Sequence, residues 1–197
     1  MHHVVRIATQ SDLDAAARVL AAAFAEYAWT RWALPADGYH ERLQEIQRLY
    51  LDHASENGIV VVDEGVHSVA AFLPAHAPAP SEALQQRVAE LHGSRLEALM
   101  SLDLPQAPEG SWTLETVGVD PAHQGVGLGT AVLSHGLALI DAQDAAIALE
   151  TSDERNVRLY ERFGFKTNEV TTIPNGPVVY SMSRPAISST SRVDLSQ

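Results

Sequence analysis

Residues 124–129 read Gln-Gly-Val-Gly-Leu-Gly and form the most distinctive stretch of this sequence. Glycines let the backbone turn sharply and approach a ligand closely. A β-branched, apolar segment at 113–119 precedes the run, and apolar residues at helical spacing follow it as far as Ile140. A helix N-terminus offers unpaired N–H groups and the positive end of a dipole, which favour anions. The order strand, glycine loop, helix therefore predicts a site for a phosphate or pyrophosphate group.

Two common phosphate-binding loops do not fit the register of these glycines. In the dinucleotide pattern Gly-x-Gly-x-x-Gly, Gly125 and Gly127 take the first two positions, but Thr130 stands in the third. The nucleoside-triphosphate loop needs a lysine after its last glycine, and this loop has none. A strand-to-helix turn that uses glycines only for close packing is the structural alternative.

A second group of residues with chemical potential follows at 149–165. Asn156 and Tyr160 are four residues apart on a helix expected at 156–163, so they share one helix face. A phenol with a pKa near 10 is protonated at neutral pH and can give a proton to a leaving group. Gly164 is predicted to end that helix. Tyr160 is therefore a candidate general acid, and packing in the core is its structural alternative.

Two carboxylates are candidates for the base. Glu115 lies two residues before Val117, so the spacing predicts both side chains on one face of the strand. Glu150 stands at the end of the next predicted strand. Each could instead bind a substrate ammonium group or make a structural hydrogen bond, and a water-relayed base, or none, is a further alternative. His123 is expected to face solvent, and the histidines show no metal-ligand spacing, so no metal is expected.

Composition narrows the class of protein. The net charge of −12 argues against nucleic acid as a partner, because nucleic-acid binding depends on Lys and Arg. The same charge could attract a cationic amine over a distance, or could serve solubility alone. The absence of cysteine excludes disulfides and a cysteine nucleophile. No segment is long and apolar enough to cross a membrane and no secretory pattern is present, so a cytoplasmic location without a membrane partner is expected.

Alternating strand and helix patterns must position these residues, with no domain linker between them. Strands are expected at 4–8, 59–62, 66–73, 113–119, 146–150, 165–173 and 178–184. Helices are expected after a cap at Ser11 and Asp12, at 39–53, at 81–102, after the glycine loop and at 156–163. Loops are expected at 29–38, 74–80 and 105–110, which contain proline or glycine.

Together the two motifs resemble those of the GNAT superfamily of N-acetyltransferases. Gln124, Gly127 and Gly129 fit its coenzyme A loop, Gln/Arg-x-x-Gly-x-Gly, and residues 149–165 resemble its second signature. The resemblance implies one α/β domain over 1–184, with a mixed, strongly twisted sheet of about seven strands and helices on both faces. Residues 185–197 are polar and are expected to form a flexible tail.

The resemblance also implies acetyl-CoA as the co-substrate and assigns residues to it. Val117 and Val119 would pair with the pantetheine arm along a splayed strand, and an N–H at or near Val119 would polarise the thioester carbonyl. Val126, Gly127, Gly129 and Thr130 would donate N–H groups to the pyrophosphate, and Asn156 would contact the coenzyme near the pantetheine. The full set of implied coenzyme-binding residues is Val117, Gly118, Val119, Gln124, Gly125, Val126, Gly127, Leu128, Gly129, Thr130 and Asn156.

A closer resemblance, from residue 5 to 182, is to the puromycin N-acetyltransferases, an antibiotic-inactivating branch. It is carried by 5–27, 94–99, 116–132 and 149–165, and it departs at 29–38, at 74–80 and at Glu115. It implies N-acetylation of the primary amine of a small molecule such as puromycin or an aminoacyl-nucleoside relative. Acetylation of a protein or peptide N-terminus and an acyl-CoA sensor without turnover are the alternatives, and a monomer and a homodimer both stay open.

Three aromatic residues after the first helix, Tyr27, Trp29 and Trp32, are predicted to line the amine pocket together with Glu150. Aromatic walls suit an aromatic acceptor and can hold an ammonium group by cation–π contact. The alternative is that these rings fill a small satellite core.

Overall fold

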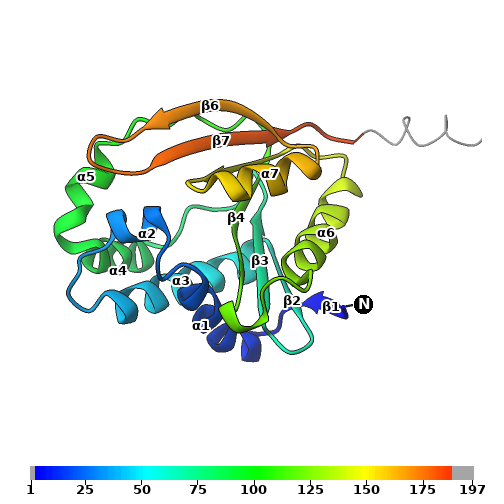
Figure 1. Ribbon diagram of the computed structural model, residues 1–197, viewed down its shortest axis with the longest axis horizontal. Helices are drawn as coiled ribbons and strands as arrows, with labels where there is room; N and C mark the ends of the chain where they lie inside the picture. The colour runs from blue at the N-terminus through cyan, green and yellow to red at the C-terminus, as the bar shows by residue number, and fades with distance from the viewer. Residues whose placement is uncertain (1–2, 188–197) are drawn as a thin grey trace, which may run out of the picture.

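Seven strands form one mixed sheet in the order β1-β2-β3-β4-β5-β7-β6. All neighbouring strands are antiparallel except β4 and β5, which are parallel. The sheet is strongly twisted, since β6 and β7 cross the direction of β2 and β3 (Figure 1). The computed structural model describes residues 3–187, and most of the tail predicted at 185–197 lies outside them. The strands are β1 Val5–Ile7, β2 Ile59–Asp63, β3 Ser68–Leu73, β4 Trp112–Val119, β5 Ile147–Thr151, β6 Lys166–Thr172 and β7 Val178–Arg184.

Helices cover both faces of this sheet, as expected. The helices are α1 Leu13–Ala23, α2 Ala28–Ala33, α3 Tyr39–Asn57, α4 Glu82–His92, α5 Leu96–Met100, α6 Leu128–Asp141 and α7 Glu154–Arg162, with 3-10 turns η1 Gln10–Asp12, η2 Gly93–Arg95 and η3 Pro121–His123. None of the helices in residues 3–187 has the length and apolar character that a membrane crossing requires.

Strand alternation explains why two helical layers form. On β2 and β3, Val60 and Val69 are buried in a cluster with α1 and α3, whereas Val61 and Phe72 are buried in a cluster with α6. Successive side chains of a strand point to opposite faces, so a run of apolar residues needs cover on both. Figure 1 shows α1 and α3 on one side of β2 and β3, with α6 on the other.

The prediction of a loop at 29–38 is wrong for its first half, because α2 forms there. Thr30 explains part of this, because its hydroxyl donates to the carbonyls of Phe24 and Tyr27 at 2.7 and 3.0 Å. Those two bonds fold the chain back after α1 and start a new turn. The helix ends just before Pro35, as the residue before a proline disfavours helical geometry.

Two other predicted helices have different bounds. The helix predicted at 81–102 is interrupted at Gly93, whose φ of +48° ends α4 before η2 and α5 continue. The helix predicted to open at Asn156 begins two residues earlier, because Asp153 caps it by accepting from the Arg155 N–H at 2.8 Å. Asn156 therefore lies inside the first turn of α7.

Candidate active site

The parallel strands β4 and β5 separate soon after they begin. Their pairing consists of Trp112 with Ile147 and Thr113 with Ala148, while β5 stays paired with β7 as far as Thr151. Past Thr113, within residues 3–187, the β4 backbone has no β5 partner, so its polar groups on that side are available to a ligand. A cleft of about 1230 Å³ opens at this divergence, bounded by β4, β5, α2 and the α4–α5 segment.

Glu115 is the extra residue of a β-bulge in β4. The register places Ala71 opposite Thr116 and Phe72 opposite Leu114, which leaves Glu115 without a partner on β3. Because of this bulge, Leu114 and Val117 pack against the same cluster beside α6. The prediction that Glu115 and Val117 share a strand face is therefore wrong. Glu115 points into the cleft instead, near Tyr50 of α3.

The two candidate bases lie near each other in the cleft. Both Glu115 and Glu150 are exposed to the cleft, and the walls of the cleft surround their side chains. Burial raises the pKa of Glu115, and the charge of Glu150 raises it further. Burial also raises the pKa of Glu150. Carboxyl groups with raised pKa values are better proton acceptors, so this pair is suited to base chemistry.

Tyr160 lies on α7 with its ring packed against Phe165 and its side chain at the wall of the cleft. Only 5% of the residue is exposed. Burial, and then the nearby Tyr27, raises the pKa of Tyr160 well above its usual range. The phenol is consequently protonated at neutral pH and can act only as a proton donor there.

Tyr27 joins the start of α2 to the end of β5. Its phenol oxygen lies 2.9 Å from Thr151 Oγ1 and accepts the Ser152 N–H at 2.7 Å. The Asn156 amide lies 3.5 Å from the same Thr151 hydroxyl. Tyr27, Asn156 and Tyr160 thus meet at one wall of the cleft, although the sequence separates Tyr27 widely from the other two.

The two tryptophans of α2 are in different environments. Trp29 lines the cleft, whereas Trp32 is not among the lining residues in the described part of the chain. Trp32 packs instead against the β6–β7 turn, where its indole nitrogen would lie 2.9 Å from a Cβ added at Gly176. The rings touch, with centroids 5.6 Å apart. Trp32 therefore contacts Trp29 and the β6–β7 turn but does not form the wall predicted for it.

The glycine loop has the geometry of an anion cradle. Gly125 and Gly127 adopt φ of +80° and +93°, and a Cβ at Gly125 would meet nothing within 4 Å. The exposed residues 124–127 lead into α6, whose first residue, Leu128, is buried. The loop and the helix N-terminus are thus at the surface, where the His3 ring lies 2.7 Å from the Val126 carbonyl, and such a helix N-terminus suits a pyrophosphate.

Other predicted coenzyme residues have structural reasons for their identity. Gly118 faces α1, where a Cβ would lie 2.9 Å from Leu20. Gly129 gives room to Val119, whose Cγ2 would be 3.1 Å from an added Cβ. The Gln124 amide donates to the Val119 carbonyl at 3.2 Å and closes the start of the loop. Val126 is exposed and Thr130 follows on the first turn of α6. None of residues 124–130 lines the cleft, so the loop lies outside it, after the end of β4.

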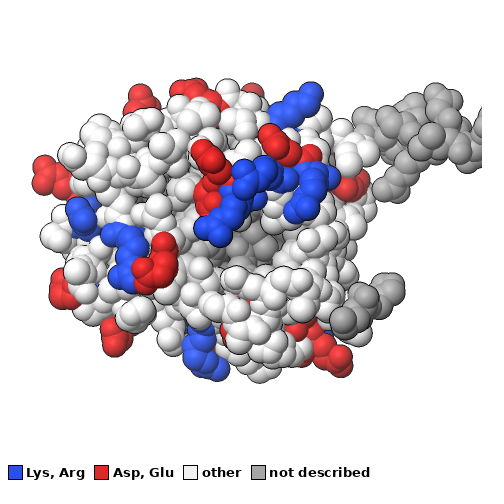
Figure 2. All heavy atoms as spheres, viewed as in Figure 1, with Lys and Arg blue, Asp and Glu red and all other residues white. Residues whose placement is uncertain are grey.

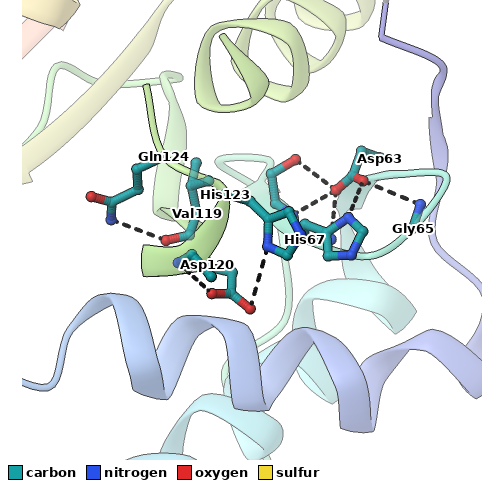
Figure 3. Close-up of polar contacts among 9 residues, drawn as sticks. Asp63, Gly65, His67, Val119, Asp120, His123 and Gln124 are labelled. Carbon is teal, nitrogen blue, oxygen red and sulfur yellow. Dashed lines mark hydrogen bonds and ion pairs between the residues drawn. The ribbon is translucent and has the colours of Figure 1, made fainter. Parts of the chain in front are cut away.

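Two stacked histidines lie just before the glycine loop (Figure 3). The rings of His67, after the β2–β3 turn, and His123, in η3, stack with centroids 3.8 Å apart. The buried Asp63 accepts the His67 and Ser68 N–H groups at 2.7 and 2.6 Å. Burial alone would raise the pKa of Asp63, but its hydrogen bonds lower it overall. Asp63 is therefore an ionised anchor for His67, and no sequence pattern indicated that either residue lies beside the loop.

The comparisons with known proteins agree with this geometry. The profile of the acetyltransferase (GNAT) family matches residues 22–165. A structure described as histone acetyltransferase HPA2 and related acetyltransferase, from Corynebacterium glutamicum, is 25% identical, with a TM-score of 0.76 over 96% of this chain and 99% of that one.

Two more distant structures share the fold. The ribosomal-protein-S18-alanine N-acetyltransferase of Escherichia coli is 17% identical, with a TM-score of 0.56 and coverage of 95% of this chain and 96% of that one. A putative acetyltransferase from Salmonella typhimurium, solved with its cofactor acetyl-CoA, is 16% identical with the same TM-score and coverage.

Proposed function

This chain belongs to the acetyltransferase (GNAT) family and is an N-acetyltransferase, and we propose that it transfers the acetyl group of acetyl-CoA to the primary amine of a small molecule. The observation that carries the proposal is the divergence of β4 and β5. It exposes β4 backbone at the point where Glu115, Glu150 and Tyr160 line one cleft. Acetyl-CoA supplies an activated acyl group as a thioester. Residues of this chain supply a base, a hydrogen-bond donor for the carbonyl oxygen and an acid.

Each residue has a definite task in the transfer. Glu115, with Glu150 beside it, accepts a proton from the ammonium form of the acceptor, directly or through water, so that a nitrogen lone pair is free. An N–H at or near Val119 hydrogen-bonds the carbonyl oxygen as negative charge develops on it. The C–N bond forms, the nitrogen then releases its second proton to solvent, the C–S bond breaks, and Tyr160 gives its proton to the departing sulfur. The first proton taken from the amine stays on the base, and the proton released to solvent restores Tyr160.

The charge of the cleft indicates which amines fit. The carboxylates Glu115, Glu150 and Glu169 line it, and no Lys or Arg does so within the described part of the chain. Such a cleft favours an ammonium group and disfavours an acceptor that carries a carboxylate or phosphate. Of the lining hydroxyls, Thr116 Oγ1 and Ser152 Oγ are buried with no protein hydrogen-bond partner among residues 3–187, so a ligand's polar groups could pair with them.

The cleft also has an apolar wall. α5 contributes Leu96, Leu99 and Met100 to it, and no residue of α5 is fully buried. Together with Trp29 this wall suits an acceptor with a large apolar or aromatic body. Puromycin and aminoacyl-nucleoside relatives combine a primary amine with such a body and have no carboxylate. Acetylation of such an antibiotic in the cytoplasm would remove its ammonium charge and would confer resistance.

A thiol-release assay over matched amines tests this function. We expect turnover with puromycin and with phenylalaninamide, and little with phenylalanine, which differs from the amide in its carboxylate. Ethanolamine tests the need for an apolar body, and a peptide with a free N-terminal alanine tests the peptide alternative. Turnover of the peptide alone would refute a small-molecule acceptor. Calorimetric binding of acetyl-CoA without turnover of any amine would instead indicate a sensor.

A further inference from the structure

A second bulge in the sheet turns another glutamate toward the cleft. In β6, Thr167 is opposite Met182 of β7. The next pair is Glu169 with Ser181, which leaves Asn168 between them as the extra residue. Without an extra residue, side chains two positions apart in a strand share one face. The bulge therefore moves Glu169 to the face opposite to that of Thr167, and Glu169 lines the cleft.

Contacts with β7 hold this bulge in place. The Asn168 amide nitrogen donates to Ser183 Oγ at 2.8 Å, and the same hydroxyl donates to Asn168 Oδ1 at 3.2 Å. None of the ion pairs formed by residues 3–187 involves Glu169. The direction of Glu169 is thus set by the backbone of the sheet, and its charge is not neutralised by a described cation.

Glu150, Ser181 and Glu169 form one row across three neighbouring strands. Ser181 of β7 is opposite Glu150 of β5 on one side and Glu169 of β6 on the other. Side chains that pair directly across antiparallel strands lie on the same face, and all three residues line the cleft. Because neighbouring strands are about 4.8 Å apart, the Cα atoms of the two glutamates are on the order of 10 Å apart.

The centre of this row is a buried hydroxyl with capacity for a further hydrogen bond. Ser181 is only 7% exposed, and its Oγ forms no hydrogen bond of normal geometry within residues 3–187. It is near enough to Glu150 to oppose the rise in the pKa of that carboxyl. Buried polar atoms are usually hydrogen-bonded. A polar ligand that lies along the row could supply the partner.

The two glutamates of the row have different surroundings. Glu150 lies near Glu115, and burial raises the pKa of both. Glu169 is on the edge strand and is exposed, and an exposed carboxylate is charged at neutral pH. A negative charge two strand spacings from the proposed base is too remote to take a proton from the same amine. It is suited to hold a second positive group of the acceptor.

We propose that Glu169 selects acceptors with a second cationic group, which it binds while the reacting amine lies at Glu115 and Glu150. The two positive groups would be on the order of 10 Å apart, with an apolar spacer that suits the wall formed by α5. An amine with a single charge remains an acceptor, but a poorer one. The inference rests on the proposed function and narrows its acceptor class.

Two amines of the same shape test this selection. Each has a primary amine at one end of a hexyl chain, and the other end carries a trimethylammonium group in one compound and a tert-butyl group in the other. Only the primary amine can be acetylated. We expect a wild-type kcat/KM about fivefold higher for the charged compound, as a partly exposed ion pair would give. This ratio should fall toward one in Glu169→Gln and below one in Glu169→Lys.

The overall charge of the protein requires a matched control. Acidic side chains are spread around the edge of the face in Figure 2, and together they attract any cation. Glu161→Gln removes one negative charge from an exposed position of α7 that does not line the cleft, and it should keep the wild-type ratio. A structural role of Glu169 would lower both rates together and leave the ratio unchanged, so the ratio reports the charge.

The outcomes separate this inference from the function itself. Equal kcat/KM values for the two compounds in the wild type would overturn the inference and leave the function standing. A preference that persists in both Glu169 variants, or that Glu161→Gln lowers equally, would also overturn it. The same holds if neither compound reacts while phenylalaninamide does. No turnover of any amine would contradict the proposed function, and the inference with it.

Discussion

The phenol oxygen of Tyr27 lies 2.9 Å from Thr151 Oγ1, although 124 positions separate the two residues. This contact ties the junction of α1 and α2 to the end of β5, close to Glu150 and α7. The proposed acceptor wall and the proposed acetyl site therefore share a structural element. A change at Tyr27 should affect the placement of both, whereas a change at the outer end of the cleft should not.

Tyr27→Phe removes both hydrogen bonds of the phenol oxygen and leaves the Ser152 N–H without its partner. We expect a loss of about 1–3 kcal/mol in the free energy of unfolding, measured with urea, because a buried donor becomes unpaired. The acceptor KM should also rise. Tyr180→Phe is the control. The Tyr180 hydroxyl bonds the exposed Glu154, so its removal should lower the free energy of unfolding much less than Tyr27→Phe does. Equal stabilities of the two variants would contradict this role of Tyr27.

Trp29→Ala should raise the acceptor KM by about tenfold, since an aromatic wall and a cation–π contact are lost, and should leave the coenzyme KM unchanged. Trp32→Ala removes a ring of the same size that does not line the cleft. It should reduce stability and change the acceptor KM much less. If Trp32→Ala raises the acceptor KM as much as Trp29→Ala does, the assignment of the wall to Trp29 is wrong.

The raised pKa values of Glu115 and Glu150 give a signed pH prediction. A base must be deprotonated, so kcat/KM should fall as the pH drops through the raised pKa of Glu115. Glu150→Gln removes a neighbouring negative charge, lowers the pKa of Glu115 and should move this acidic limb to lower pH. Glu115→Gln should lower kcat by on the order of a hundredfold and abolish the limb. A profile that neither change moves would favour a base outside this pair.

Gly127→Glu should weaken acetyl-CoA binding strongly, measured by calorimetry. A Cβ there meets only His3, at 3.7 Å, so the change does not clash with the protein; it strains the φ of +93° and places a carboxylate near the pyrophosphate. Gly110→Glu, at φ of +76° with nothing within 4 Å, controls for the strain. If both variants bind acetyl-CoA as the wild type does, the loop serves packing only.

The sequence predicts elements well where the pattern is local. The glycine loop, the strand before it and the helix after it follow from glycine spacing and helical periodicity. The seven strands were predicted, and the mixed sheet that the resemblance implied is confirmed. Helical spacing also predicted that Asn156 and Tyr160 share one face of a helix, and both residues line the cleft.

The features that depend on distant partners were not predictable in the same way. The bulge at Glu115 reflects the register between β3 and β4, which no residue in β4 specifies alone. The different roles of Trp29 and Trp32 depend on where the β6–β7 turn packs. The stack of His67 on His123 joins a hairpin turn to the segment before the glycine loop, and nothing in the spacing of the two histidines indicates it.

Single-turnover thiol release by Tyr160→Phe tests most directly the claim that this cleft carries out acetyl transfer with Tyr160 as its acid. The enzyme is saturated with acetyl-CoA and mixed with an acceptor identified in the amine assay. We predict a rate lower by on the order of a hundredfold or more, with coenzyme affinity unchanged because the ring still packs on Phe165. Because burial raises the pKa of Tyr160 well above its usual range, loss of its proton should not produce an alkaline limb in the wild-type pH profile at or below pH 10. A folded variant with a near-normal rate would contradict the account, since the proton for the leaving sulfur would then come from water.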